Sequence, residues 1–122
     1  MQTFFKLSLV SSAVLLATAI SDPTSAQTAS NTALTRYQAD QIMNGRCSGG
    51  AGYAADAAAR RGESRDRYTQ WAYRVLMSNF SIPQLQSMIR DAESAGSGGN
   101  RDQREIAEFQ ICILDTKMAY IS

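Results

Sequence analysis

The amino-acid sequence predicts an all-α fold: a small antiparallel bundle of four to five helices with one disulfide, after a cleaved signal peptide. Two observations predict the bundle. Apolar residues recur at helical spacing in successive segments, and three of these segments begin with Thr, Ser or Asn followed three residues later by Gln. No hairpin signal or sustained alternation of apolar and polar residues appears elsewhere. Amphipathic helices with short connections pack as an antiparallel bundle.

The N-terminus has the pattern of a secretory signal peptide: a basic start, an apolar stretch over residues 7–20, and a short polar end. Thr24 and Ala26 place small side chains at positions −3 and −1 of a cleavage site between Ala26 and Gln27. Cleavage after Ala19 is the second choice. The apolar stretch is too short to span a bilayer, so we expect cleavage rather than an uncleaved membrane anchor. The mature chain is then periplasmic or secreted, with no membrane span.

Cleavage divides the chain into a signal peptide (1–26), a small polar stretch that we expect to be a flexible tail (27–33), and one helical domain (34–122). The leader holds Lys6 and Asp22, so the mature chain keeps 11 of the 12 basic and 10 of the 11 acidic residues. Nucleic acids and anionic membranes are bound by surfaces of a single charge sign. The balanced charge therefore argues against a nucleic-acid partner.

The chain has two cysteines, Cys47 and Cys112, which lie 65 positions apart. In an oxidising compartment they most simply form one intramolecular disulfide. A loop of this size stabilises a fold by about 4 kcal/mol in the chain-entropy model. An intermolecular bridge and two buried thiols are the alternatives.

The first helix is expected to begin with a capping box at Thr35 and Gln38. A stripe at helical spacing follows and turns the first cysteine inward: Ala39, Ile42, Met43 and Cys47. The glycines of residues 49–52 then kink or restart the helix, which alanines continue to Gly62. Gly and Ala give a thin face that lets another helix approach closely. The alternative, a phosphate-binding loop, would need the Lys-Ser/Thr of a P-loop and a preceding strand.

The next two helices are expected over residues 67–80 and from Ser81 to the glycine-rich residues 96–100. The first of them has an apolar face made by Tyr68, Trp71, Ala72, Val75, Leu76 and Phe80. Ser81 and Gln84 form a capping box with Pro83 in the first turn. The stripe of this helix consists of Ile82, Leu85, Met88, Ile89 and Ala92.

The last helix is expected to begin with a capping box at Asn100 and Gln103. It is apolar around much of its circumference, through Ile106, Phe109, Cys112, Ile113 and Thr116 and also Ile111, Leu114, Met118 and Ile121. Residues 109–114 alone could form a buried strand, but the cap and the length favour a helix covered by others. We therefore expect this helix at the centre of the bundle, linked to the first helix by the disulfide.

Catalytic residue patterns are absent from the sequence. The chain has no histidine, which removes the commonest general base and the commonest neutral metal ligand. Ion pairs of Arg101 with Glu105 and of Arg104 with Glu108 account for the acidic residues near Asp102. The one lysine of the mature chain, at position 117, belongs to no catalytic motif. We expect no enzymatic activity, no metal site and no cofactor.

Two surface features are candidates for binding a partner protein. Four arginines lie around one helix connection: Arg60, Arg61, Arg65 and Arg67. Their guanidinium groups could hold carboxylates or phosphates, or they could complement the helix dipoles together with neighbouring acidic residues. Tyr73 lies off the apolar stripe of its helix, where it could anchor a partner or cover the rim of a small core.

The combination of an export signal, a short helical domain and one wide-spaced disulfide is similar in kind to periplasmic acid-stress chaperones and to helical immunity proteins that bind secreted toxins. The resemblance is one of size and architecture, and it assigns no residue. With no catalytic pattern, it leads us to expect an inhibitor, immunity or stress-chaperone-like protein that binds another protein. The alternatives are a structural envelope component and a histidine-free hydrolase, which would need carboxylates from separate helices to converge.

Overall fold

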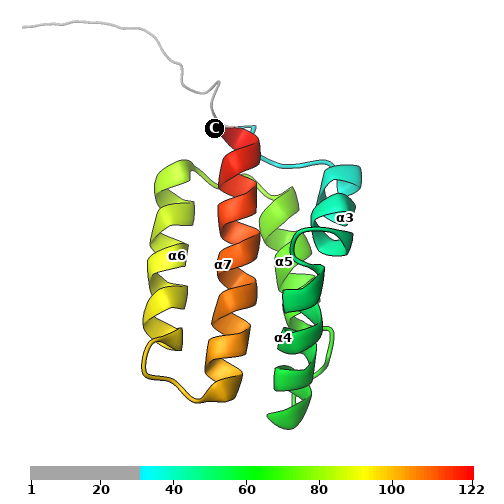
Figure 1. The fold of residues 1–122 in the computed structure, drawn as a ribbon. Coiled ribbons are helices and arrows are strands. Elements are labelled where there is room, and N and C mark those ends of the chain that lie inside the picture. The colour runs from blue at the N-terminus through cyan, green and yellow to red at the C-terminus, as the bar shows by residue number, and fades with distance from the viewer. Residues whose placement is uncertain (1–30) are drawn as a thin grey trace, which may run out of the picture. The chain divides into compact units, whose positions relative to one another are not determined.

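The computed structural model describes residues 31–122, so the predicted signal peptide and residues 27–30 of the predicted tail lie outside the described residues. The described part is all-helical, as predicted, and Figure 1 shows its arrangement. Its helices are α3 (Arg36–Asn44), α4 (Ser48–Arg60), α5 (Arg67–Met77), α6 (Ile82–Gly96) and α7 (Arg101–Ile121).

The three predicted capping boxes are all present. The side chains of Thr35, Ser81 and Asn100 accept hydrogen bonds from the backbone N–H groups three residues later, at 3.1, 3.3 and 2.9 Å. In each case the side-chain oxygen of the Gln at that later position accepts a hydrogen bond from the N–H of the N-cap residue. Two of the free amides at each helix start are thereby satisfied by residues of the same turn, which is why the sequence alone locates these starts.

The first helix ends earlier than predicted. Its last residue is Asn44, and Cys47 is the N-cap of α4 instead of the last member of the first apolar stripe. The chain turns at Gly45, where an added Cβ would lie 2.7 Å from the carbonyl oxygen of Gln41. A residue with a side chain would clash there, so glycine ends the helix before the stripe is complete.

The glycine run therefore lies inside α4 and does not interrupt it. Of its glycines, Gly50 faces α7, where an added Cβ would be 3.4 Å from the Cα of Phe109. Gly49 and Gly52 have no such neighbour within 4 Å. The prediction that this thin face admits a neighbouring helix is confirmed at Gly50.

The last helix is central, as predicted. Figure 1 shows α7, in orange and red, between α6 on one side and α4 and α5 on the other. Its Phe109, Ile113 and Leu114 are almost fully buried. By contrast, α6 packs against α7 and makes only slight contact with the other described helices. A Cβ on Gly96 would lie 2.7 Å from the Cβ of Ala107, so glycine allows α6 to approach α7 closely at this end.

Two residues that we placed in the N-terminal tail are hydrogen-bonded to the helical domain. The N–H groups of Thr32 and Ala33, assigned to the tail by their composition, donate to the Asn79 side chain at 2.9 and 3.1 Å. The next amide, of Leu34, donates to the Leu76 carbonyl at 2.9 Å. These long-range hydrogen bonds hold residues 32–34 against the end of α5. No local pattern in the sequence predicts them.

The predicted disulfide between Cys47 and Cys112 is present, with 5.9 Å between the two Cα atoms. It connects the start of α4 to the middle of α7. We expected it to connect the first and last helices, and the earlier end of α3 moves this attachment point onto α4. The bridge thus fixes the α3–α4 junction against the central helix.

Candidate functional site

The four arginines singled out in the sequence are all paired with carboxylates of the same domain. The pairs are Arg60 with Asp102 and Glu105, Arg61 with Glu63, Arg65 with Asp56, and Arg67 with Glu63, at 2.6 to 3.5 Å. Their charges are therefore largely balanced within the protein. This arrangement favours the electrostatic interpretation of the cluster, and partner binding by these arginines stays a prediction.

Arg60 makes the most extensive of these pairs. From the end of α4 it donates to Asp102 at 2.7 Å and to Glu105 at 2.6 Å, both in the first turns of α7. The hydrogen bonds to Asp102 and then to Glu105 raise the pKa of this guanidinium above its ordinary value. Arg60 and Asp102 lie 42 positions apart in the sequence, so the spacing of residues within one helix could not have predicted this pair.

One of the two ion pairs predicted along α7 is confirmed. Arg101 donates to Glu105 at 3.2 Å. Arg104 does not pair with Glu108 as predicted, because its guanidinium instead donates to the carbonyl of Gly99 at 2.6 Å. The loop carbonyl lacks a helical partner and lies within reach, so it competes successfully for the arginine.

Tyr73 is half-buried and bonded inside the domain. Its hydroxyl donates to Asp40 of α3 at 2.6 Å, and the guanidinium of Arg36 lies 4.6 Å from its ring centre. The hydrogen bond from Tyr73, followed by that from Arg36, lowers the pKa of Asp40, and the same Tyr73–Asp40 bond raises the pKa of Tyr73. The ring therefore joins α3 to α5, as a residue at the rim of the core would, and its role as a partner anchor stays a prediction.

Lys117 has a structural role at the end of α5 that we did not predict from the sequence. Its side chain is fully buried, with 0% of its surface exposed. The ammonium donates to the carbonyls of Val75 at 2.6 Å, Leu76 at 3.3 Å and Ser78 at 2.5 Å, and it lies 5.5 Å from the ring centre of Phe80. A cation thus satisfies the carbonyl end of α5, where the helix dipole is negative.

A signal for this burial was present in the sequence. Lys117 lies four residues after Ile113 and three after Leu114, so it continues the apolar stripe of α7. A charged residue on such a stripe is normally read as the edge of the exposed face. Only the position of α5 shows that its backbone carbonyl groups lie within hydrogen-bond distance of the Lys117 amine.

The stability of the fold should depend on pH through Lys117. Burial lowers the pKa of its ammonium from 10.5 to about 8. Between these values the unfolded chain binds the proton and the folded chain does not, so the free energy of unfolding should rise with pH across this window. At about 1.4 kcal/mol per pH unit, the rise from pH 7.5 to 9.5 should be about 2 kcal/mol.

Urea unfolding at the two pH values measures this effect. The variant Lys117→Met, which has no titrating amine at this position, supplies the baseline for all other groups. The difference between the wild-type and variant slopes is the contribution of Lys117. Parallel pH profiles for the two proteins would show that the amine titrates equally in the folded and unfolded states.

A groove lies between α5 and α6, and residues of α7 line part of it. It consists of two adjoining hollows of about 230 and 270 Å³, which share Trp71 and Met88 as walls. The first hollow is completed by Asp91, Ala92, Ala95, Gln110 and Leu114, and the second by Arg74, Val75, Ser78 and Phe80. We call these residues together the α5–α6 groove. It exists because α6 packs on α7 without closing against α5.

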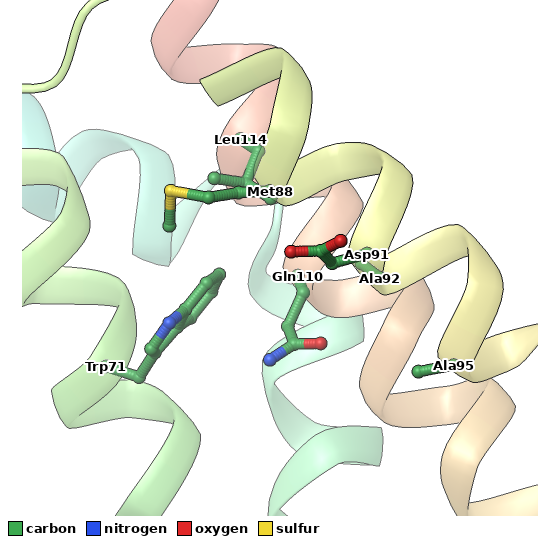
Figure 2. Close-up of a pocket in the computed structure, with 7 residues that line it drawn as sticks. All are labelled: Trp71, Met88, Asp91, Ala92, Ala95, Gln110 and Leu114. Carbon is green, nitrogen blue, oxygen red and sulfur yellow. The ribbon is translucent and has the colours of Figure 1, made fainter. Parts of the chain in front are cut away.

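Polar groups face the apolar walls of this groove. Figure 2 shows the indole of Trp71 on one side of the first hollow and the Asp91 carboxylate and Gln110 amide on the other. Within residues 31–122, none of these three side chains makes a hydrogen bond or ion pair. Trp71 itself is held edge-on against the buried ring of Phe109, with 6.5 Å between the ring centres. The groove therefore offers a fixed aromatic surface beside unused polar groups, a combination typical of binding sites.

A hydrolase would need carboxylates that converge in one pocket. In the described part of the chain, Glu93 and Glu108 line a third hollow of about 260 Å³ together with Arg104. Both glutamates are exposed to solvent, unlike the buried carboxyl pairs that perform acid–base catalysis. Residues 31–122 also hold no cluster of three His, Cys, Asp or Glu side chains that could bind a metal ion.

Within residues 31–122, no helix combines the length and apolar character needed to cross a membrane. Comparisons of the chain with models of known protein families, with curated proteins and with solved structures found no match.

Proposed function

We propose that this protein is an exported helical binding module, of the inhibitor or immunity type, whose α5–α6 groove holds a segment of another protein. The observation that carries the proposal is the groove itself. One flank of the central helix is left open between α5 and α6, and the walls there are Trp71, Met88 and unused polar groups. Aromatic and methionine side chains in such positions are common anchors at protein interfaces.

The dimensions of the groove favour a polypeptide over a small molecule. Each hollow, at about 230 and 270 Å³, is smaller than the pockets of about 300 to 1,000 Å³ that enclose small ligands. Two such hollows in a row suit successive side chains of one segment. A net charge of +1 for the whole chain, with arginines already paired to carboxylates, gives no support to nucleic acid as the partner.

The disulfide supports the exported part of the proposal. A structural bridge between the two cysteines of the chain is stable in an oxidising compartment and rare in the cytosol. Together with the pattern of the leader, it favours the periplasm or the cell exterior. Mass spectrometry of the protein recovered from its native envelope should find a chain that begins at Gln27 and lacks free thiols. A full-length chain with two free thiols would contradict export.

Site-specific photo-crosslinking in the native envelope tests the groove. A photoreactive amino acid at Ala95, an exposed position that lines the groove, should give an adduct of one discrete mass. The matched control is the same substitution at Ala59, which is exposed on α4 and does not line the groove. Equal adducts at both positions, or none at Ala95, would contradict the proposal.

The single tryptophan of the chain provides an independent measurement. Trp71 lies in the groove, so its fluorescence reports on this site alone. The partner identified by crosslinking should shift the Trp71 emission to shorter wavelength on titration, because the indole loses contact with water. A partner that binds without changing this emission would have to bind elsewhere.

A further inference from the structure

The α5–α6 groove carries opposite charges at its two ends. Arg74 lines the hollow that also contains Phe80, and Asp91 lines the hollow that also contains Ala95. Neither Arg74 nor Asp91 forms an ion pair with any of the residues 31–122, in contrast to the paired arginines around Glu63. Each is the only charged residue of its hollow. A segment bound in the groove would therefore meet a cation at one end and an anion at the other.

The helix geometry fixes the order of these charges. Trp71 and Met88 line both hollows and mark the middle of the groove. Arg74 follows Trp71 by three residues on α5, and Asp91 follows Met88 by three residues on α6. Figure 1 shows that α5 and α6 run in opposite directions, so the two charges lie on opposite sides of the middle. At a rise of 1.5 Å per residue, each is displaced by about 4.5 Å along the groove.

The buried ammonium of Lys117 strengthens this polarity. Two of the carbonyl groups that hold it belong to Val75 and Ser78, which line the same hollow as Arg74. Its charge thus lies beneath the end of the groove that is already positive. Inside the protein this charge is less screened than one on the surface.

We infer that the groove holds an amphipathic helix of the partner protein, in which one apolar side chain lies between an acidic and a basic residue, each about one turn away. The apolar side chain packs between Trp71 and Met88, the acidic residue lies at the Arg74 end, and the basic residue lies at the Asp91 end. This inference rests on the proposed function and adds the chemistry of the bound segment.

A helix suits this site better than an extended strand. The helices α5, α6 and α7 present three sides of a bundle, and the missing fourth side is where a partner helix would pack. The two charges are about 9 Å apart along the groove, which is close to two helical turns. Side chains at the first, fourth and eighth positions of a helix lie on one face at this spacing.

Binding of synthetic helical peptides of about 14 residues tests the inference. The central leucine is constant, and the residues one turn before and one turn after it are Glu and Arg, Glu and Glu, or Arg and Arg. We expect the wild-type protein to bind the Glu/Arg peptide roughly fivefold to tenfold more tightly than the other two, because only this peptide forms both ion pairs. Anisotropy of a dye on the peptide and Trp71 emission both report binding.

Charge variants of the protein should change this preference. Asp91→Arg makes both ends of the groove positive, so the Glu/Glu peptide should become the tightest ligand. Arg74→Glu makes both ends of the groove negative, so this variant should bind the Arg/Arg peptide most tightly. Both positions are exposed, so neither substitution should disturb the fold. Circular dichroism of each variant checks this.

A wild-type protein that binds the three peptides equally, or binds none of them, would overturn the inference. So would a preference that the two charge variants leave unchanged. The proposed function would survive each of these results if crosslinking at Ala95 still gave a discrete adduct. If crosslinking at Ala95 gave no discrete adduct, the proposed function would be contradicted, whatever the result with the peptides.

Discussion

Replacing both cysteines with alanine should lower the free energy of unfolding by about 4 kcal/mol. The disulfide closes a loop of 65 positions, and the chain-entropy model assigns its stabilisation to the restriction of the unfolded chain. Cys47 is also almost fully buried, so its loss removes a small amount of packing in addition. For a domain of this size, such a change is a large part of the total stability.

Urea unfolding followed by circular dichroism measures this effect in the variant Cys47→Ala/Cys112→Ala. The control is the wild-type protein with its disulfide reduced, which has the same sequence without the covalent link. Both should unfold at a much lower urea concentration than the oxidised protein, and with a steeper dependence on urea because the unlinked chain exposes more surface. Equal midpoints for the oxidised and reduced wild-type protein would show that the bridge contributes nothing.

The variant Lys117→Ala should lose about 3 kcal/mol of stability at neutral pH. It removes three buried methylene groups, each worth about 0.8 kcal/mol, and takes the hydrogen-bond donor away from the carbonyls of Val75 and Ser78. The Leu76 carbonyl keeps a partner, because the N–H of Leu34 donates to it. Removal of a buried charge offsets part of these losses, since burial already lowers the pKa of the ammonium to about 8.

Two further variants identify the origin of this loss. Lys117→Met keeps an unbranched apolar stem in the same space and removes only the donor, so it should cost less than Lys117→Ala. Arg90→Ala removes a long cationic side chain from an exposed position of α6 and should change stability by less than about 0.5 kcal/mol. If Lys117→Ala were as mild as Arg90→Ala, the lysine would not be buried in solution.

Lys117 is also suited to a direct titration measurement. Lys6 and Lys117 are the lysines of the chain, and the first lies in the predicted leader. After cleavage, Lys117 would be the single lysine, and its amine is enclosed by backbone carbonyls and the Phe80 ring. Selective isotope labelling of lysine would then give one side-chain signal, whose titration reports directly on the α5 end of the groove.

The local features of the fold could be predicted from the sequence because they are made by neighbouring residues. A capping box needs only a polar N-cap and a Gln three residues later, so the starts at Thr35, Ser81 and Asn100 were evident. The end of the first helix was not, because the apolar stripe continues past Gly45 to Cys47. There the backbone turn, and not the apolar period, decides where the helix stops.

The candidate site was predicted less well. The sequence drew attention to exposed arginines and to Tyr73, but ion pairs to Asp102 and Asp56 and a hydrogen bond to Asp40 occupy several of these side chains. Trp71 was read as a core residue, yet it is half-buried and lines the groove. An apolar stripe identifies the side chains that face other helices, but it cannot show where two helices fail to meet.

The sequence by itself determined that the described domain is helical, where most of its helices begin, and that its two cysteines pair with each other. Those properties depend on contacts within one turn, or on there being a single way to form an intramolecular bridge. The tertiary structure decided that Lys117 closes the end of α5, that Arg60 joins α4 to α7, and that α5 and α6 leave a groove over α7. These features require side chains from distant segments to meet, and their distances are set by the packing of whole helices.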